Sequence, residues 1–141
     1  MGPGKTISPE VGRAAIALAA ANCEKRGERT LSLGFHGGGE PTEAWDELVA
    51  FVEYARTVCF QHDLKLGIGV ATNGCLSDKK AKWLAENVSS INLSLDGPPD
   101  IQNRNRPMRG GGESSGRILE FLHRLEQAAV PYGIQSTVTT E

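Results

Sequence analysis

The sequence has little of several features that mark whole classes of protein. Its 141 residues carry a formal net charge of −2, whereas nucleic-acid binders usually show a clear basic excess or stripe. No apolar run approaches the ~18 residues that span a bilayer, and the N-terminus lacks the apolar core of a secretion signal. We therefore expect a cytoplasmic protein that binds neither nucleic acid nor membrane.

Cysteine is also scarce. The three cysteines, Cys23, Cys59 and Cys75, lie far apart and form no CxxC or CxxxCxxC pattern. Cluster and zinc sites need closely spaced thiolates, and disulfides are rare in cytosolic proteins. We expect three reduced structural thiols and no metal held by this chain.

Four strand-like runs each combine one apolar face with one small or polar face. They span residues 30–36, 64–73, 91–96 and 133–139. In the first run, leucines and a phenylalanine alternate with Ser32, Gly34 and His36, and side chains on a strand alternate between its two faces. Parallel strands buried on both faces read instead as near-continuous Val, Ile and Leu. The second face therefore indicates a cavity, whose expected lining includes His36, Asn73, Gln135 and Thr137.

Helix patterns precede each of these runs. Ser8, with Pro9 and Glu10 behind it, is a start signal, and the helix is expected to bury Val11, Ala14, Ala15 and Leu18. Thr42 is expected to cap the second helix, Ser77 the third, and Ser114 or Ser115 the fourth. The order α-β-α-β-α-β-α-β predicts an α/β fold, a partial parallel (β/α) barrel with strands side by side in chain order.

The first predicted element is a helix, and the last is a strand that ends near Glu141. A natural α/β domain usually begins with a strand. We therefore expect residues 1–141 to be the central part of a larger domain, whose first and later βα units lie outside this sequence.

The carboxyl ends of the strands, where parallel α/β folds bind ligands, carry distinct motifs. The first is His36-Gly37-Gly38-Gly39-Glu40-Pro41, in which the glycines let the backbone approach a ligand and the carboxylate suits an ammonium group. Thr72-Asn73-Gly74 and Ser94-Leu95-Asp96-Gly97-Pro98 follow the next two strands. A patternless stretch from Pro98 to Glu113 then offers arginines that could bind a carboxylate with two hydrogen bonds.

In this order, the motifs resemble the radical S-adenosylmethionine (SAM) superfamily, in the branch of anaerobic sulfatase-maturating enzymes and related SPASM-type peptide modifiers. The resemblance covers almost the whole chain and rests on Phe35 to Pro41, Thr72 to Gly74, Ser94 to Pro98 with Arg104 to Pro107, and Thr137 to Thr139. In that family a partial barrel holds a 4Fe–4S cluster on a CxxxCxxC loop, and SAM bound there yields a 5′-deoxyadenosyl radical. This chain lacks that loop.

The resemblance implies roles for particular residues. Gly38, Gly39 and Glu40 would meet the amino group of the methionine part of SAM, although the extra Gly37 departs from the family's two-glycine form. Ser94 would lie near the ribose and carboxylate of SAM, and Asp96 would shape the same loop. Arg106 would bind the carboxylate.

The resemblance also implies a parent enzyme, a radical SAM oxidoreductase or maturase that modifies a peptide or protein. Flavodoxin or ferredoxin would supply its electrons, and the segment alone would be inactive. Two other interpretations stay open: a cluster-free α/β module that binds a nucleoside-like ligand, and an interaction scaffold without a ligand. A CxxxCxxC encoded before Met1 would favour the radical SAM enzyme over both alternatives.

Overall fold

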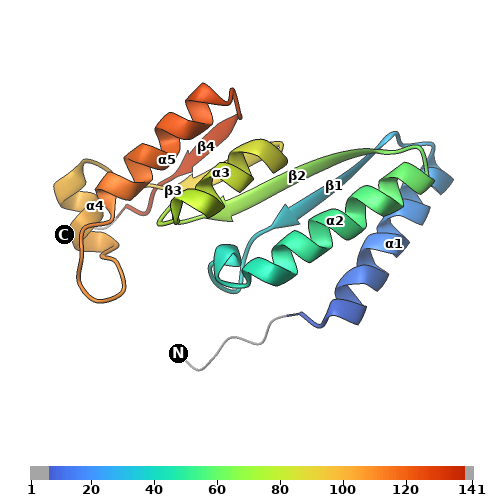
Figure 1. Ribbon diagram of the computed structural model, residues 1–141, viewed down its shortest axis with the longest axis horizontal. Coiled ribbons are helices and arrows are strands. Elements are labelled where there is room, and N and C mark those ends of the chain that lie inside the picture. The colour runs from blue at the N-terminus through green and yellow to red at the C-terminus, as the bar shows by residue number, and fades with distance from the viewer. Residues whose placement is uncertain (1–6, 139–141) are drawn as a thin grey trace. The chain divides into compact units, whose positions relative to one another are not determined.

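The computed structural model describes residues 7–138 of the chain (Figure 1). Its four strands form one parallel sheet in the order β1-β2-β3-β4. The predicted α/β class and the chain-order sheet are confirmed, as expected for short crossovers that place successive strands side by side. The elements are α1 (Pro9–Arg26), β1 (Thr30–Phe35), the 3-10 helix η1 (Pro41–Glu43), α2 (Trp45–Gln61), β2 (Lys65–Thr72), α3 (Asp78–Asn87), β3 (Ser90–Ser94), α4 (Pro99–Asn105), α5 (Ser115–Gln127) and β4 (Tyr132–Gln135).

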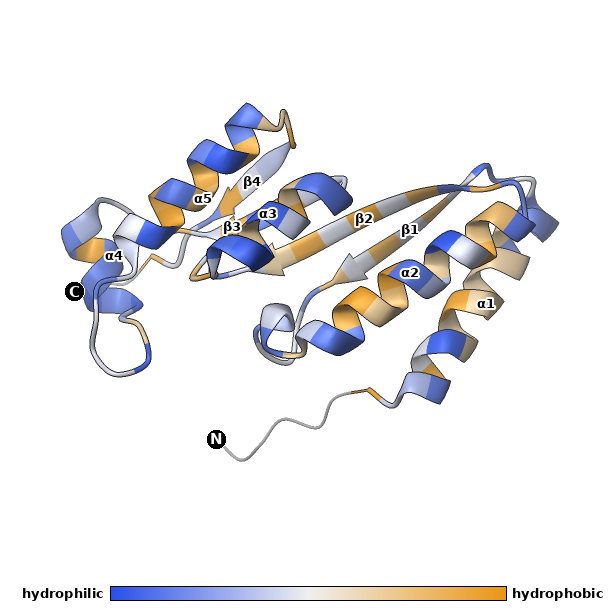
Figure 2. Cartoon of the chain, in the orientation of Figure 1, coloured by the Kyte–Doolittle hydropathy of each residue, from blue (hydrophilic) through white to orange (hydrophobic). Residues whose placement is uncertain are grey.

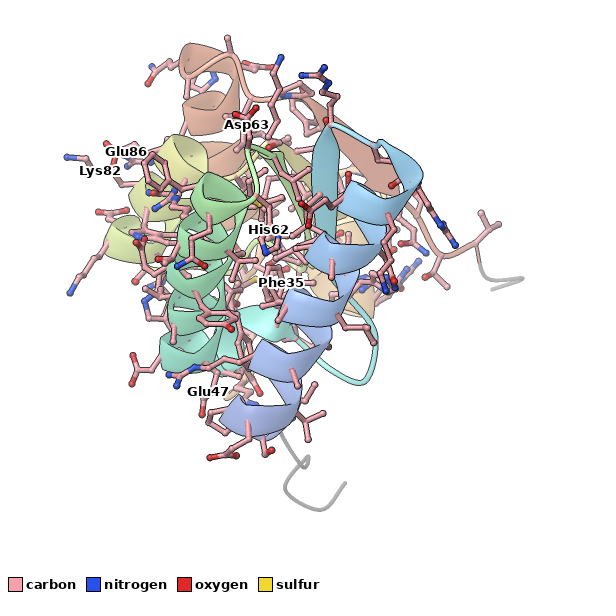
Figure 3. The ribbon with its side chains drawn as sticks, turned by 90° about the vertical axis from the view of Figure 1, so that its right-hand side faces the viewer. Phe35, Glu47, His62, Asp63, Lys82 and Glu86 are labelled. Carbon is pink, nitrogen blue, oxygen red and sulfur yellow. The ribbon has the colours of Figure 1, made fainter. Side chains whose placement is uncertain are left out.

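The chain divides into two compact units, Met1–Gly69 and Val70–Glu141. In the first unit α1 and α2 pack on β1 around a shared apolar core. Phe35, at the end of β1, packs against this core between the two helices (Figure 3). The buried core residues are Ile16, Ala20, Cys23, Leu31, Phe51, Ala55, Val58 and Cys59.

Helix α1 begins as predicted but buries a different face. The Ser8 hydroxyl accepts a hydrogen bond from the backbone N–H of Val11 at 3.3 Å, which satisfies one free donor of the first turn. The expected face of Val11, Ala14, Ala15 and Leu18 is exposed, and the helix instead buries Gly12, Ile16, Ala20 and Cys23.

Close packing against α2 decides this orientation. A Cβ atom on Gly12 would overlap with ring carbons of Phe51, so only the glycine face of α1 admits the aromatic ring. Because α1 is rich in alanine around its whole circumference, the 3.6-residue period by itself does not select one face.

The second unit packs α3 and α5 together, and β3 pairs in parallel with β4. The Ser77 hydroxyl accepts a hydrogen bond from the N–H of Lys80, so the predicted start of α3 is confirmed. Helix α5 buries the apolar side chains of Ile118, Phe121 and Leu125. Figure 2 shows the alternation of apolar and less apolar residues along β2 that the sequence predicted.

Two further predictions of local structure are wrong. Thr42 does not cap α2; it lies in η1, and α2 begins after Ala44 with no side-chain cap. The stretch expected to be patternless contains α4, whose start has a proline and Asp100 in the first turn, both typical of helix N-termini.

The last predicted run is only partly described. β4 ends at Gln135, and Thr139 lies outside the described residues. Among the described residues, no helix has the length and hydrophobicity needed to cross a membrane.

Candidate functional site

The loop after β1 exposes an unusual length of bare backbone. Gly37, Gly38 and Gly39 have φ values of +78°, +68° and +151°, a region that residues with a side chain rarely adopt. No heavy atom lies within 4 Å of a Cβ added at any of the three. The loop therefore leaves room for another molecule to approach its backbone.

The carboxylate of Glu40 is fixed at the end of this loop. Its Oε1 accepts hydrogen bonds from the backbone N–H of Thr42 at 3.2 Å and from the Thr42 hydroxyl at 2.7 Å. Thr42 is buried and Glu40 is half-buried. The side chain that the sequence assigned to ligand binding thus also caps η1, which limits its rotamers.

In the second unit, Asp96, Arg106 and Thr137 form a closed ring of polar contacts. The Arg106 Nε donates to Asp96 Oδ2 at 2.8 Å, and the Arg106 Nη2 donates to the Thr137 hydroxyl at 3.0 Å. The backbone N–H of Thr137 donates to Asp96 Oδ1 at 2.9 Å. The predicted loop after β3 therefore forms an ion pair with Arg106, and the segment after β4 is hydrogen-bonded to both members of that pair.

The two charged partners differ in exposure. The Asp96 side chain is 2% exposed, while that of Arg106 is 33% exposed. The hydrogen bond from Arg106, and next that from the Thr137 backbone, lower the pKa of Asp96 below its ordinary value. Asp96 is therefore ionised at neutral pH and accepts hydrogen bonds with both oxygens.

Two side chains of α4 that the sequence patterns did not reveal hold the backbone on either side of Arg106. Gln102, fully buried in α4, accepts a hydrogen bond from the backbone N–H of Asp96 at 2.7 Å through Oε1. Asn103 Oδ1 accepts from the N–H groups of Ser114 and Ser115 at 3.0 and 2.9 Å, so it caps α5 in place of either serine. The proline and Asp100 at the start of α4 were the available signal in the sequence. They indicate a helix, and a helix would hold Gln102 and Asn103 in fixed positions.

The other predicted site residues occupy the expected strand ends. Ser94 is half-buried at the end of β3, opposite Gln135 of β4, which is exposed. Asn73 Oδ1 accepts a hydrogen bond from the N–H of Cys75 at 2.8 Å, and His36 is exposed after β1. Gly38, Gly39 and Glu40 belong to the first unit, and the residues from Ser94 onward belong to the second.

The thiols do not form a ligand set. Cys23 and Cys59 are buried, and burial raises the pKa of both thiols. Cys75 is half-buried. Within residues 7–138, no group of three or more His, Cys, Asp or Glu side chains is placed to hold a metal ion.

Known relatives match this chain in sequence and in fold. It is 34% identical over 107 residues to a cysteine-type anaerobic sulfatase-maturating enzyme of Clostridium perfringens, and 33% identical over 107 residues to that of a second strain. The solved structure of native anSMEcpe with bound AdoMet and Kp18Cys peptide matches with a TM-score of 0.77 and 27% identity over 92% of this chain. The chain matches a segment of a sulfatase-maturating radical SAM barrel.

The chain spans 28% of the length of the two C. perfringens relatives and 35% of the anSMEcpe chain. A second anSMEcpe structure, with bound AdoMet and Cp18Cys peptide, matches with a TM-score of 0.75 and 26% identity, over 94% of this chain and 36% of that one. No protein-family model matches the chain. The suspected similarity to anaerobic sulfatase-maturating enzymes is confirmed over the matched part of the chain.

Proposed function

We propose that residues 1–141 are the central part of a radical SAM enzyme that modifies a peptide or protein. The observation that carries this proposal is the match to the anSMEcpe barrel, whose structures hold AdoMet with a peptide. SAM at a 4Fe–4S cluster supplies 5′-deoxyadenosyl radical chemistry, while the protein supplies placement and excludes water.

The loop after β1 fits the ammonium end of SAM. Its three glycines present backbone with no side chain in the way, and the Glu40 carboxylate carries the opposite charge. We assign Gly38, Gly39 and Glu40 to this amino group. Because Thr42 fixes one carboxylate oxygen, Glu40 needs no large rearrangement to present its charge.

Arg106 fits the carboxylate of SAM. A guanidinium has five N–H donors, and the contacts of Arg106 with Asp96 and Thr137 use two of them. Planar pairing with a carboxylate uses two parallel hydrogen bonds. Ser94, at the end of β3, would lie near the ribose and carboxylate, and Asp96 would shape the loop.

The remaining parts of the proposed enzyme lie outside this chain. We propose that the cluster is held by cysteines other than the three of this chain, and that flavodoxin or ferredoxin supplies its electrons in the cytoplasm. The exposed or half-buried side chains of His36, Asn73, Gln135 and Thr137 are proposed to line the cavity that holds SAM or the substrate.

In the full-length protein with its cluster reconstituted, we expect Glu40→Gln and Arg106→Ala each to weaken SAM binding. Each removes a charge-assisted contact, which contributes about 1.5 to 3 kcal/mol, roughly ten- to a hundredfold in affinity. Gln at position 40 keeps an oxygen that can accept from Thr42, so η1 stays capped. Calorimetric titration with SAM measures the effect.

Arg104→Ala is the matched control, because Arg104 is an exposed arginine at the end of α4. Its SAM affinity should equal that of the wild type, and all variants should keep the cluster spectrum. Unchanged affinity in Glu40→Gln would show the glycine-loop assignment to be wrong, and the extra Gly37 would then shift the motif by one residue. SAM binding to a full-length protein that has no cluster would support the cluster-free module instead.

A further inference from the structure

We propose that Asp96 and Thr137 are positioning residues that orient the Arg106 guanidinium toward the carboxylate of SAM. This inference rests on the proposed function, which assigns Arg106 to that carboxylate. It adds a reason why this arginine, rather than Arg104 or Arg109 of the same stretch, is suited to the task.

The contacts of Arg106 occupy one edge of its guanidinium group. Nε donates to Asp96 Oδ2 at 2.8 Å, and Nη2 donates to the Thr137 hydroxyl at 3.0 Å. These two nitrogens carry the parallel hydrogens of the side-on edge. Both hydrogens of Nη1 and the second hydrogen of Nη2, which supply the end-on edge, have no protein acceptor within residues 7–138.

An unoccupied end-on edge is the geometry that a carboxylate recognises. Two parallel N–H donors match the two oxygens of a carboxylate, which gives both energy and direction. A ligand that approached the side-on edge would have to displace Asp96, whose side chain is only 2% exposed. The ion pair thus leaves one edge of Arg106 for ligand.

The acceptors of Arg106 are themselves held in place. Asp96 Oδ1 accepts from the Thr137 backbone at 2.9 Å, and the Asp96 backbone N–H donates to the buried Gln102 side chain at 2.7 Å. A free arginine side chain loses much rotamer entropy when it binds a ligand, and prior fixation reduces that loss. Removing either acceptor should therefore weaken binding without removing the charge of Arg106.

The test compares two variants with two ligands in the full-length, cluster-reconstituted protein. Thr137→Val removes the hydroxyl acceptor but keeps the shape of the side chain, and Asp96→Asn keeps an acceptor for the Thr137 backbone but removes the charge. The ligands are SAM and decarboxylated SAM, titrated by calorimetry. We expect SAM affinity to fall roughly three- to tenfold in Thr137→Val and roughly tenfold or more in Asp96→Asn.

Decarboxylated SAM distinguishes orientation of Arg106 from general support of the loop. Its affinity should change less than twofold in both variants, because it has no carboxylate for Arg106 to bind. Thr137→Ser restores the hydroxyl and should bind SAM like the wild type. Ser136→Ala is the matched control: the Ser136 hydroxyl donates to the Leu95 backbone carbonyl at 2.6 Å, so it holds the same loop without touching Arg106.

Equal losses for both ligands, or a loss in Thr137→Ser as large as in Thr137→Val, would overturn the inference. So would wild-type SAM affinity in Asp96→Asn and Thr137→Val, provided that Arg106→Ala still weakens binding; the proposed function would then stand without this positioning role. Wild-type affinity in Arg106→Ala would instead show the carboxylate assignment itself to be wrong. Thermal melting of each variant identifies one that fails to fold. If Asp96→Asn fails to fold, the SAM affinities of Thr137→Ser and Thr137→Val decide whether the inference holds.

Discussion

Two glycines with the same backbone conformation serve different purposes. Gly27 ends α1 with φ +67°, and a Cβ there would meet nothing within 4 Å. Gly74 has φ +73°, but its Cβ would lie 2.7 Å from Leu93 Cδ1 and 3.3 Å from Ile118 Cγ1. Conformation alone requires glycine at the first position, and conformation and packing together require it at the second.

We therefore expect Gly74→Ala to be more destabilising than Gly27→Ala. The left-handed conformation costs an alanine about 1 to 2 kcal/mol at either position, and overpacking adds about 1 to 3 kcal/mol at Gly74 alone. Urea unfolding of the two variants and the wild type measures both free energies. Equal losses would mean that the β3 and α5 side chains move aside without cost.

Helix α1 packs through its smallest residue. The ring of Phe51 on α2 occupies the space that a side chain at Gly12 would need. This contact turns Val11 and Leu18 toward solvent, where they are 58% and 63% exposed. The packing of two helices, rather than hydrophobicity, sets the orientation of α1.

Gly12→Ala should consequently destabilise the protein, although alanine favours helices. Helix propensity alone would stabilise the variant by about 1 kcal/mol, whereas overpacking in a filled core costs about 1 to 3 kcal/mol. Gly116→Ala is the matched control, because Gly116 lies in α5 with nothing within 4 Å of its Cβ position. It should raise the melting temperature while Gly12→Ala lowers it, and a rise in both would show that Phe51 readily moves.

On the scale of the whole chain, the three thiols are too dispersed to hold a cluster, and two of them are buried. Burial raises the pKa of Cys23 and Cys59, and thiolates, not thiols, bind iron. We expect anaerobic reconstitution of this chain with iron and sulfide to give no stoichiometric 4Fe–4S signal in optical or EPR spectra. The full-length protein serves as the positive control, and a stoichiometric signal from residues 1–141 would contradict the prediction that the ligands lie elsewhere.

The strands, most helix starts and the motifs at the strand ends could be predicted from local sequence patterns. These features follow from periods of 2 and 3.6 residues and from short-range bonds such as that between Ser8 and Val11. A parallel α/β sheet brings the ends of successive strands to one edge, so the strand pattern alone was enough to identify the candidate loops.

Which side chains meet within those loops depends on long-range contacts in the folded chain. The partner of Arg106 at Thr137 lies 31 residues away, and Gln102 reaches Asp96 only because α4 forms where the sequence showed no hydrophobic period. The buried face of α1 likewise depended on Phe51, a residue of another helix. Local patterns specify each element and its faces, but a specific contact depends on the shape and charge of a neighbour that the local sequence does not contain.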